Sequence, residues 1–299
     1  MKPVNIGLLG LGTVGGGTAT VLQDNASEIS RRLGREVRIS AVCDLSEEKA
    51  KQICPKAAFI KYPFERFQQQ DVVVVGVLFG GTVIAKDAVL KAIENGKHIV
   101  TANKKLLAEY GNEIFPLAEE KNVMVQFEAA VAGGIPIIKA LREGLAANQI
   151  RSIAGIINGT SNFILTEMRE KGSAFADVLK EAQALGYAEA DPTFDIEGHD
   201  AGHKITIMSA LAFGTPMNFS ACYLEGISKL DSRDIKYAEE FGYRIKLLGI
   251  TRKTDKGIEL RVHPTLIPES RLLANVNGVM NAVRVNADMV GETLYYGAG

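Results

Sequence analysis

Short apolar runs alternate with helix-length amphipathic segments over the first part of the chain. We expect strands at residues 4–9, 38–43, 72–78, 98–101 and 123–127. The run at 72–78 is rich in β-branched residues, which is typical of a parallel strand buried on both faces. Helical segments lie between the runs, the last of them at residues 110–121. This alternation predicts a doubly wound α/β sheet of about 127 residues.

The pattern changes after Phe127, where a stretch rich in small residues, glycine and proline leads into a second region. Strands are expected there at residues 150–157, 246–251, 258–263, 279–285 and 292–296, mostly joined by short turns. Helices are expected at residues 163–171 and from Gly198 onward. We therefore predict an N-terminal doubly wound Rossmann-type domain over residues 1–128. An α+β domain with a mostly antiparallel sheet and helices on one side follows over residues 129–299.

Composition narrows the class of protein. The chain has 299 residues, of which 46% are hydrophobic, and a net charge of −1, which argues against a general nucleic-acid or membrane-surface role. There is no apolar run of about 20 residues, and the N-terminus leads directly into a strand rather than a signal peptide. Cys43, Cys54 and Cys222 have no metal-ligand spacing, so we expect reduced thiols. These features predict a cytoplasmic protein.

A glycine motif follows the first strand. It consists of Gly10, Leu11, Gly12, Thr13, Val14 and Gly15. In a strand–turn–helix context, Gly10 permits the tight turn, Gly12 lets the backbone approach a pyrophosphate, and Gly15 allows close helix–strand packing. The motif predicts a dinucleotide site, and the alternative is a structural glycine turn.

Two further polar residues stand at the carboxyl ends of predicted strands. Asp44 can accept hydrogen bonds from the adenosine ribose hydroxyls, which favours NAD over NADP; the alternative is a helix N-cap. It comes later than the usual spacing because a charged insert, residues 25–36, is expected to lengthen the first helix. Lys104 is a candidate active-site cation, although a solvated loop lysine is the commoner case.

Carboxylates, imidazoles and a lysine crowd into residues 186–208. Asp200 and Lys204 are four residues apart and share one face of the predicted helix. The alternative to a catalytic pair is a surface salt bridge, worth less than about 1 kcal/mol. His199 and His203 imitate the H-E-x-x-H zinc motif, so a metallohydrolase is a rival class, although no third ligand with clear spacing follows. A second rival is a dinucleotide-sensing protein without catalytic activity.

The loop that begins at Glu128 joins the two predicted domains. Its small residues, two glycines and a proline can expose successive carbonyls to a bound cation. A domain hinge is the competing interpretation.

Five blocks along the chain together resemble one family. In order they read GLGTVG, TANK, EAAVAGGIPII, INGTSNFIL and GYAEADPTFDIEGHDAGHK. Their order and spacing are similar to those of homoserine dehydrogenase, and the resemblance covers the whole chain. It implies NAD(P)-dependent interconversion of L-homoserine and L-aspartate 4-semialdehyde, on the route from aspartate to threonine, methionine and isoleucine.

The resemblance also implies roles for individual residues. Lys204 falls on the family's proton donor, and Glu189 and Asp200 fall on substrate contacts. Lys104 falls at the cofactor and reacting centre, with Gly80 and Gly297 as further cofactor contacts. The family's site for a monovalent cation, Na⁺ or K⁺, maps to Glu128, Val131, Gly133 and Ile135. One departure is Val77, which stands where the family usually carries an acid.

The chemistry agrees with these roles. Hydride arriving at an aldehyde carbon leaves oxyanion character on the oxygen, which needs a proton and a nearby cation. Lys204 can supply both, while Glu189 and Asp200 hold the substrate ammonium group. The substrate carboxylate is then left to the backbone amides of Asn158, Gly159 and Thr160.

The resemblance further predicts a homodimer or homotetramer, with dimers formed through the sheet of the second domain. In the family the glycine-rich tail after Tyr296 turns into a further helix, and often into an ACT-type regulatory domain. We therefore expect residues 1–299 to lack that domain, to bind the cofactor weakly, and to show no feedback inhibition by threonine.

Overall fold

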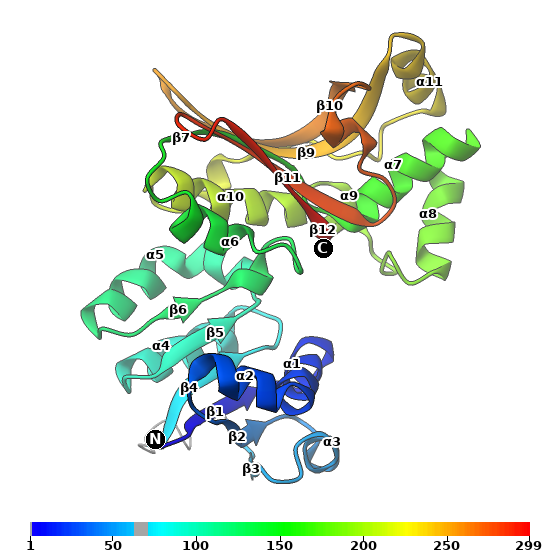
Figure 1. Ribbon diagram of the computed structural model, residues 1–299. Coiled ribbons are helices and arrows are strands. Elements are labelled where there is room, and N and C mark those ends of the chain that lie inside the picture. Colours follow the sequence, from blue (N-terminus) through cyan, green and yellow to red (C-terminus); the bar gives the residue numbers. More distant parts are fainter. Residues whose placement is uncertain (1, 63–70) are drawn as a thin grey trace. The chain divides into compact units, whose positions relative to one another are not determined.

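The computed structural model describes residues 2–62 and 71–299. The chain divides into two compact units, Met1–Ala130 and Val131–Gly299. This boundary lies two residues beyond the one expected from the sequence. Each unit has its own sheet (Figure 1).

The first unit contains a six-stranded sheet in the order β3-β2-β1-β4-β5-β6, in which every pair of neighbours is parallel. Its strands are β1 (Val4–Leu9), β2 (Val37–Cys43), β3 (Ala58–Ile60), β4 (Val72–Val77), β5 (His98–Thr101) and β6 (Val125–Gln126). Its helices are α1 (Thr13–Asp24), α2 (Ala26–Leu33), α3 (Glu47–Ile53), α4 (Val83–Glu94), α5 (Lys104–Glu120) and the 3-10 turn η1 (Glu128–Ala130). The strand order reverses direction between β1 and β4, which is where a doubly wound sheet binds its ligand. The predicted doubly wound domain is confirmed.

One apolar cluster of the first unit lies between this sheet and helices α1 and α3. Leu8, Leu11, Ala19, Val42 and Ala50 are all buried there. Leu11 belongs to the glycine motif itself, so its apolar side chain anchors the motif to the core.

Two helix predictions in the first unit are wrong. The insert 25–36 does not lengthen the first helix, because α1 ends at Asp24 and the insert forms the separate helix α2. Asn25 stands between them with φ −101° and ψ 18°, and Asn favours such helix boundaries over helix interiors. The helix expected at 110–121 begins earlier, at Lys104, because the side chain of Asn103 caps it by accepting from Leu106 N at 3.0 Å.

The second unit contains another six-stranded sheet, in the order β12-β11-β7-β9-β10-β8. Its strands are β7 (Ile150–Ile156), β8 (Tyr223–Leu224), β9 (Tyr243–Thr254), β10 (Gly257–Pro268), β11 (Met280–Ala287) and β12 (Glu292–Ala298). All neighbours are antiparallel except β8 and β10. The predicted, mostly antiparallel sheet is confirmed, with longer strands than expected at β9 and β10.

The second unit also contains helices and short helical turns. They are α6 (Ile137–Lys139), the π-helical turn η2 (Ala140–Gly144), α7 (Gly159–Lys171), α8 (Phe175–Ala184), α9 (Thr193–Ile196), α10 (His199–Phe213), η3 (Phe219–Ala221), α11 (Ser232–Glu240) and η4 (Leu272–Asn275). The helix α10 lies along the sheet (Figure 1), and a Cβ atom on Gly249 of β9 would lie 3.2 Å from Cβ of Ile205. The turn η4 instead packs against the opposite face, where Leu273 and Ala274 join Ile156 and Leu248 in a buried cluster.

Two boundaries in the second unit differ from expectation. The helix α7 begins at Gly159 rather than Phe163, because Asn158 caps it by accepting from Ser161 N at 2.8 Å. The strand β12 runs to Ala298, so Gly297 lies in a strand paired with Asn281 rather than in a turn. Among the described residues, no helix has the length and apolar character needed to cross a membrane.

Candidate active site

The glycine motif sits where β1 ends and α1 begins, and its three glycines have different surroundings. Gly10 has φ +87°, and a Cβ atom there would lie 2.9 Å from Cβ of Phe79. A Cβ atom on Gly15 would lie 1.8 Å from the carbonyl oxygen of Gly10. A Cβ atom on Gly12 would meet nothing within 4 Å. Gly10 and Gly15 are thus required by the turn and the packing, whereas Gly12 leaves open space of the kind that a pyrophosphate needs.

The start of α1 is prepared for an anion. Gly12 is the N-cap residue and offers no side chain to the first amides of this 12-residue helix. Thr13 and Val14 are exposed at this end, and Val14 retains 47% of its accessible surface. Because the first backbone N–H groups of a helix lack intrahelical acceptors, they can bind phosphate oxygens.

Asp44 at the end of β2 is tied to this loop. Its Oδ2 accepts from Leu11 N at 2.6 Å and its Oδ1 accepts from Ser46 N at 3.1 Å. Burial raises the pKa of Asp44, but the backbone hydrogen bonds and the nearby Lys49 outweigh burial and hold that pKa below its ordinary value. The N-cap alternative is wrong, because Ser46 caps α3 by accepting from Lys49 N at 3.2 Å. Asp44 therefore joins the end of β2 to the glycine loop as an ionised carboxylate.

Asn103 joins the carboxyl end of β5 to the loop that follows β4. Its Nδ2 donates to Gly81 O at 2.7 Å and to Phe79 O at 3.3 Å, which links the start of α5 to the loop after β4. Lys104 is the first residue of α5 and is half-buried, so the alternative of a solvated loop lysine is wrong. A Cβ atom on Gly80 would meet nothing within 4 Å, whereas Val77 is fully buried at the end of β4.

In the second unit, Asn158 connects three elements. Its side chain caps α7, and its Nδ2 donates to Asp195 Oδ1 of α9 at 2.8 Å and to Asp200 Oδ2 of α10 at 2.9 Å. The sequence indicated only the backbone amides of this turn. One sequence signal could have indicated the side-chain role of Asn158, because Asn is a preferred N-cap residue and stands here immediately before a helix.

The pair predicted from helix spacing is formed. Lys204 Nζ lies 2.6 Å from Asp200 Oδ2 and donates to Ile157 O at 2.7 Å. The side chain of Lys204 is 15% exposed and that of Asp200 is 2% exposed. The surface salt bridge alternative is therefore wrong, because both side chains are largely buried. Removing Lys204 would leave Asp200 as an unpaired buried carboxylate, which is strongly unfavourable.

Glu189 lies in the exposed segment between α8 and α9. The neighbouring backbone is held to the start of α7, because Thr160 Oγ1 donates to Tyr187 O at 2.6 Å. The rings of Phe163 and Tyr187 pack beside this contact with their centroids 5.0 Å apart. The segment that carries Glu189 thus runs past the N-terminus of α7.

The predicted cation loop straddles the boundary between the units, so the cation-site and hinge interpretations both stay open. Glu128 opens η1 in the first unit, and Val131, Gly133 and Ile135 lie in the second. Ala132 and Gly133 have φ of +54° and +43°. Such left-handed residues turn the chain sharply, and for alanine this conformation is unusual. A Cβ atom on Gly297 would lie 3.1 Å from Cγ1 of Ile135, so Gly297 packs against this loop.

The two histidines of the zinc-like motif are packed among aromatic rings. Phe194 and Phe219 contact the ring of His203 at centroid distances of 5.5 and 4.1 Å, and His199 stacks on Phe194. Within the described ranges 2–62 and 71–299, no group of three His, Cys, Asp or Glu side chains is arranged to hold a metal ion.

Comparisons with known proteins identify the family. Residues 10–128 match the NAD-binding domain of homoserine dehydrogenase and residues 136–299 match homoserine dehydrogenase itself. The homoserine dehydrogenase of Neisseria gonorrhoeae is 90% identical over 299 residues, which are 100% of this chain and 69% of that protein. The crystal structure of a homoserine dehydrogenase from Thiobacillus denitrificans is 64% identical with a TM-score of 0.97, over 100% of this chain and 69% of that one.

A hyperthermophilic archaeal homoserine dehydrogenase in complex with NADPH is 29% identical with a TM-score of 0.82, over 100% of this chain and 92% of that one. The likeness thus spans both units. The chain belongs to the homoserine dehydrogenase family, NAD(P)-dependent oxidoreductases that interconvert L-homoserine and L-aspartate 4-semialdehyde.

Proposed function

We propose that Lys204 exchanges a proton with the substrate oxygen during hydride transfer. The observation that supports this most strongly is the pairing of Lys204 with the buried Asp200 at 2.6 Å. An ammonium group has three donors, and Asp200 and the carbonyl of Ile157 engage two of them. The third is then available to the aldehyde oxygen, whose developing charge the ammonium stabilises. In the opposite direction, the neutral amine accepts the proton of the homoserine hydroxyl.

The substrate's two charged ends are assigned to the residues around this pair. We place the carboxylate at the Gly159 and Thr160 amides, since these begin a 13-residue helix whose N-terminus favours an anion. Glu189 supplies a carboxylate for the substrate ammonium group. Asp200 is 2% exposed, so it acts first on Lys204, and its direct contact with the substrate stays a prediction.

Residues Gly10–Gly15 would hold the nicotinamide cofactor, which would supply or accept the hydride when bound. The open space at Gly12 and the uncapped start of α1 fit its pyrophosphate. We propose that Gly80 borders the cofactor and that Lys104 adds a positive charge at the reacting centre. A contact of Gly297 with the cofactor stays a prediction.

The assay for this function follows nicotinamide absorbance after homoserine is added to the protein and oxidised cofactor. We expect reduction of the cofactor with formation of aspartate 4-semialdehyde. Absence of turnover with both NAD and NADP would contradict the proposal. The rival classes are disfavoured, because the named relatives are dehydrogenases rather than metallohydrolases or sensors.

Asp44 is expected to favour NAD by repelling the 2′-phosphate of NADP. Asp44→Asn keeps an acceptor for Leu11 N while removing the charge. The ratio of kcat/KM for NAD to that for NADP should fall by about tenfold, since removing a like charge at short range is worth ~1.4 kcal/mol. The matched control is Asp24→Asn at the far end of α1, which should leave the ratio unchanged. An unmoved ratio in Asp44→Asn would remove Asp44 from the ribose site.

A monovalent cation at Glu128, Val131, Gly133 and Ile135 is supported by the left-handed turn at Ala132 and Gly133. Activity should then depend on sodium or potassium beyond any effect of ionic strength. Replacing both by tetramethylammonium at constant ionic strength should lower kcat, because that ion is too large for a carbonyl site. Glu128→Gln should weaken the response. Equal activity in all three salts would leave the loop as a hinge.

We also propose a homodimer or homotetramer assembled through the sheet of the second unit. Tyr296 of β12, 59% exposed, and the half-buried Leu294 of the same strand supply apolar surface on that sheet. Sedimentation analysis tests the assembly, and a monomer at micromolar concentration would contradict it.

A cytoplasmic location and a role in threonine, methionine and isoleucine synthesis complete the proposal. The location is supported by Cys43, Cys54 and Cys222, none of which forms a disulfide.

A further inference from the structure

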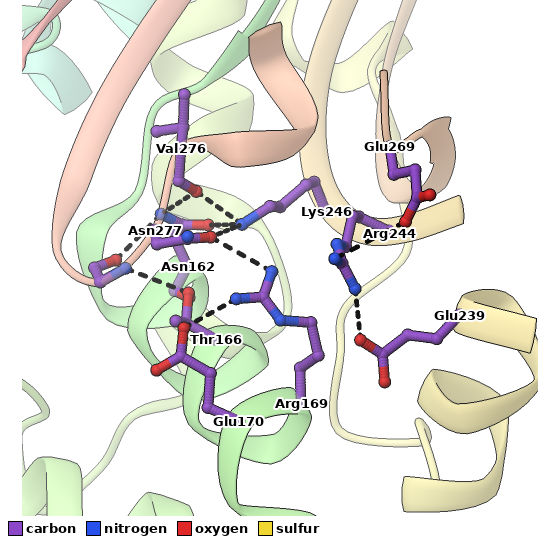
Figure 2. A network of polar contacts seen from close by, with 11 residues as sticks. Asn162, Thr166, Arg169, Glu170, Glu239, Arg244, Lys246, Glu269, Val276 and Asn277 are labelled. Atoms are coloured by element: carbon purple, nitrogen blue, oxygen red, sulfur yellow. Dashed lines mark hydrogen bonds and ion pairs between the residues drawn. The ribbon is translucent and has the colours of Figure 1, made fainter. Parts of the chain in front are cut away.

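A buried lysine lies outside the pair described above. Lys246, near the start of β9, is 1% exposed. Its Nζ donates to Val276 O at 2.5 Å, to Asn162 Oδ1 at 3.1 Å and to Asn277 Oδ1 at 3.2 Å (Figure 2). All three acceptors are neutral oxygens. Three donors are what an ammonium group offers, so the arrangement matches the charged form of lysine.

The acceptors join α7 to the segment 276–280. Asn162 Nδ2 donates to the carbonyls of Val276, Gly278 and Met280 at 3.1, 2.9 and 3.2 Å. One turn further along α7, Thr166 Oγ1 accepts from Gly278 N at 3.1 Å and donates to Asn162 O at 2.7 Å. The segment is therefore attached to two successive turns of α7, and Lys246 reaches Asn162 and the segment from β9 (Figure 2).

The same segment touches the first turn of α7 directly. A Cβ atom on Gly159 would lie 2.9 Å from the carbonyl oxygen of Val279. Asn158 and Asn162 are four residues apart, so they lie on one side of the helix. A shift of α7 against this segment would move Asn158, whose side chain holds Asp195 and Asp200.

Stability alone does not account for a lysine at this place. Burial, together with the positive charges of Arg169 and Arg244, lowers the pKa of Lys246 to about 7. The nearby carboxylates are engaged elsewhere, Glu170 with Arg169 and both Glu239 and Glu269 with Arg244. Taking an ammonium group out of water costs free energy, and hydrogen bonds to neutral oxygens offset less of that cost than a bond to a carboxylate would.

We propose that Lys246 is a positioning residue of the reaction, which acts through Asn162 and α7 to hold Asn158 in place. Asn158 in turn keeps the carboxylate of Asp200 beside Lys204. Lys246 touches neither substrate nor cofactor in this account. The inference rests on the catalytic role proposed above for Lys204.

The test is a double-mutant cycle on kcat with Lys246→Met and Asn158→Ala. Methionine removes the donors but keeps an unbranched side chain. Two of the three acceptors retain another donor, since Asn162 Nδ2 reaches Val276 O and Arg169 Nη1 reaches Asn277 Oδ1. We expect Lys246→Met to lower kcat at least about tenfold in the wild-type background and less than about twofold in the Asn158→Ala background, because residues that act as a unit are not additive.

The control is Lys97→Met, which removes another buried lysine from the first unit. It should lower kcat by the same factor in both backgrounds. If Lys246→Met fails to fold, as judged by thermal unfolding, Thr166→Val replaces it, because this change removes the acceptor of Gly278 N; it must show the same non-additivity. Equal losses of kcat in both backgrounds would overturn the inference and leave the proposed function standing. If Lys204→Met retained turnover, the proposed function itself would be at fault.

Discussion

Lys204→Met should lower kcat for homoserine oxidation by about two to four orders of magnitude, the usual range for loss of a general acid or base. Methionine fills a similar volume but can neither give nor take a proton. Nucleotide affinity should change little, since the glycine motif belongs to the other unit. Steady-state kinetics and a direct nucleotide titration measure the two quantities. Turnover within threefold of that of wild type would remove Lys204 from the chemistry.

A matched control exists on α7. Lys171 forms an ion pair with Glu167 at 2.6 Å and the same i,i+4 spacing, but its side chain is 46% exposed. Lys171→Met should leave kcat unchanged, because an exposed pair of this kind contributes less than about 1 kcal/mol to stability. Thermal unfolding of both variants separates loss of chemistry from loss of fold, since Lys204→Met also leaves the buried Asp200 without its cation.

Gly12→Val should abolish tight nucleotide binding while the protein stays folded. A Cβ atom at this position meets nothing within 4 Å, and the φ of Gly12 is negative, at −62°. The added side chain would occupy the space needed by the pyrophosphate, so the nucleotide Kd should rise by at least about tenfold, or ~1.4 kcal/mol. Isothermal titration with NAD and NADP gives the value.

Two neighbouring glycines make this prediction specific. Gly17→Ala adds a Cβ atom within α1, where it also meets nothing within 4 Å. This change should leave the nucleotide Kd within about twofold of wild type. Gly15→Ala should instead destabilise the first unit, because its Cβ atom would lie 1.8 Å from Gly10 O. A Gly12→Val protein that still binds nucleotide tightly would contradict the placement of the pyrophosphate.

The sheets could be predicted from the sequence because apolar runs bounded by turn residues mark strands in both units. Helix ends were less predictable, and capping asparagines explain two of the errors. Asn103 and Asn158 begin α5 and α7 by accepting from backbone amides, and both stand in segments rich in polar or small residues that resemble loops. The short elements α3 and β3 were not predicted, although Ser46 followed by two glutamates is a helix start signal.

The candidate site also contains contacts that the sequence predicts and contacts that it does not. Helix periodicity alone places Asp200 beside Lys204, and the structure confirms that pair. The contacts of Asn158 with Asp195 and Asp200 join residues 37 and 42 positions apart, and Lys246 reaches Asn162 across 84 positions. No spacing rule covers such tertiary contacts, so they follow only from the packing of α7, α9, α10 and β9.

The measurement that tests the role of Lys204 most directly is the primary kinetic isotope effect with homoserine deuterated at the carbon that carries the hydroxyl group. If Lys204 acts in the chemical step, hydride transfer becomes rate-limiting in Lys204→Met. Its isotope effect on kcat should then exceed that of the wild-type enzyme. A large loss of kcat without any isotope effect would contradict the account, because it would show that the substitution slows binding, release or a conformational step instead.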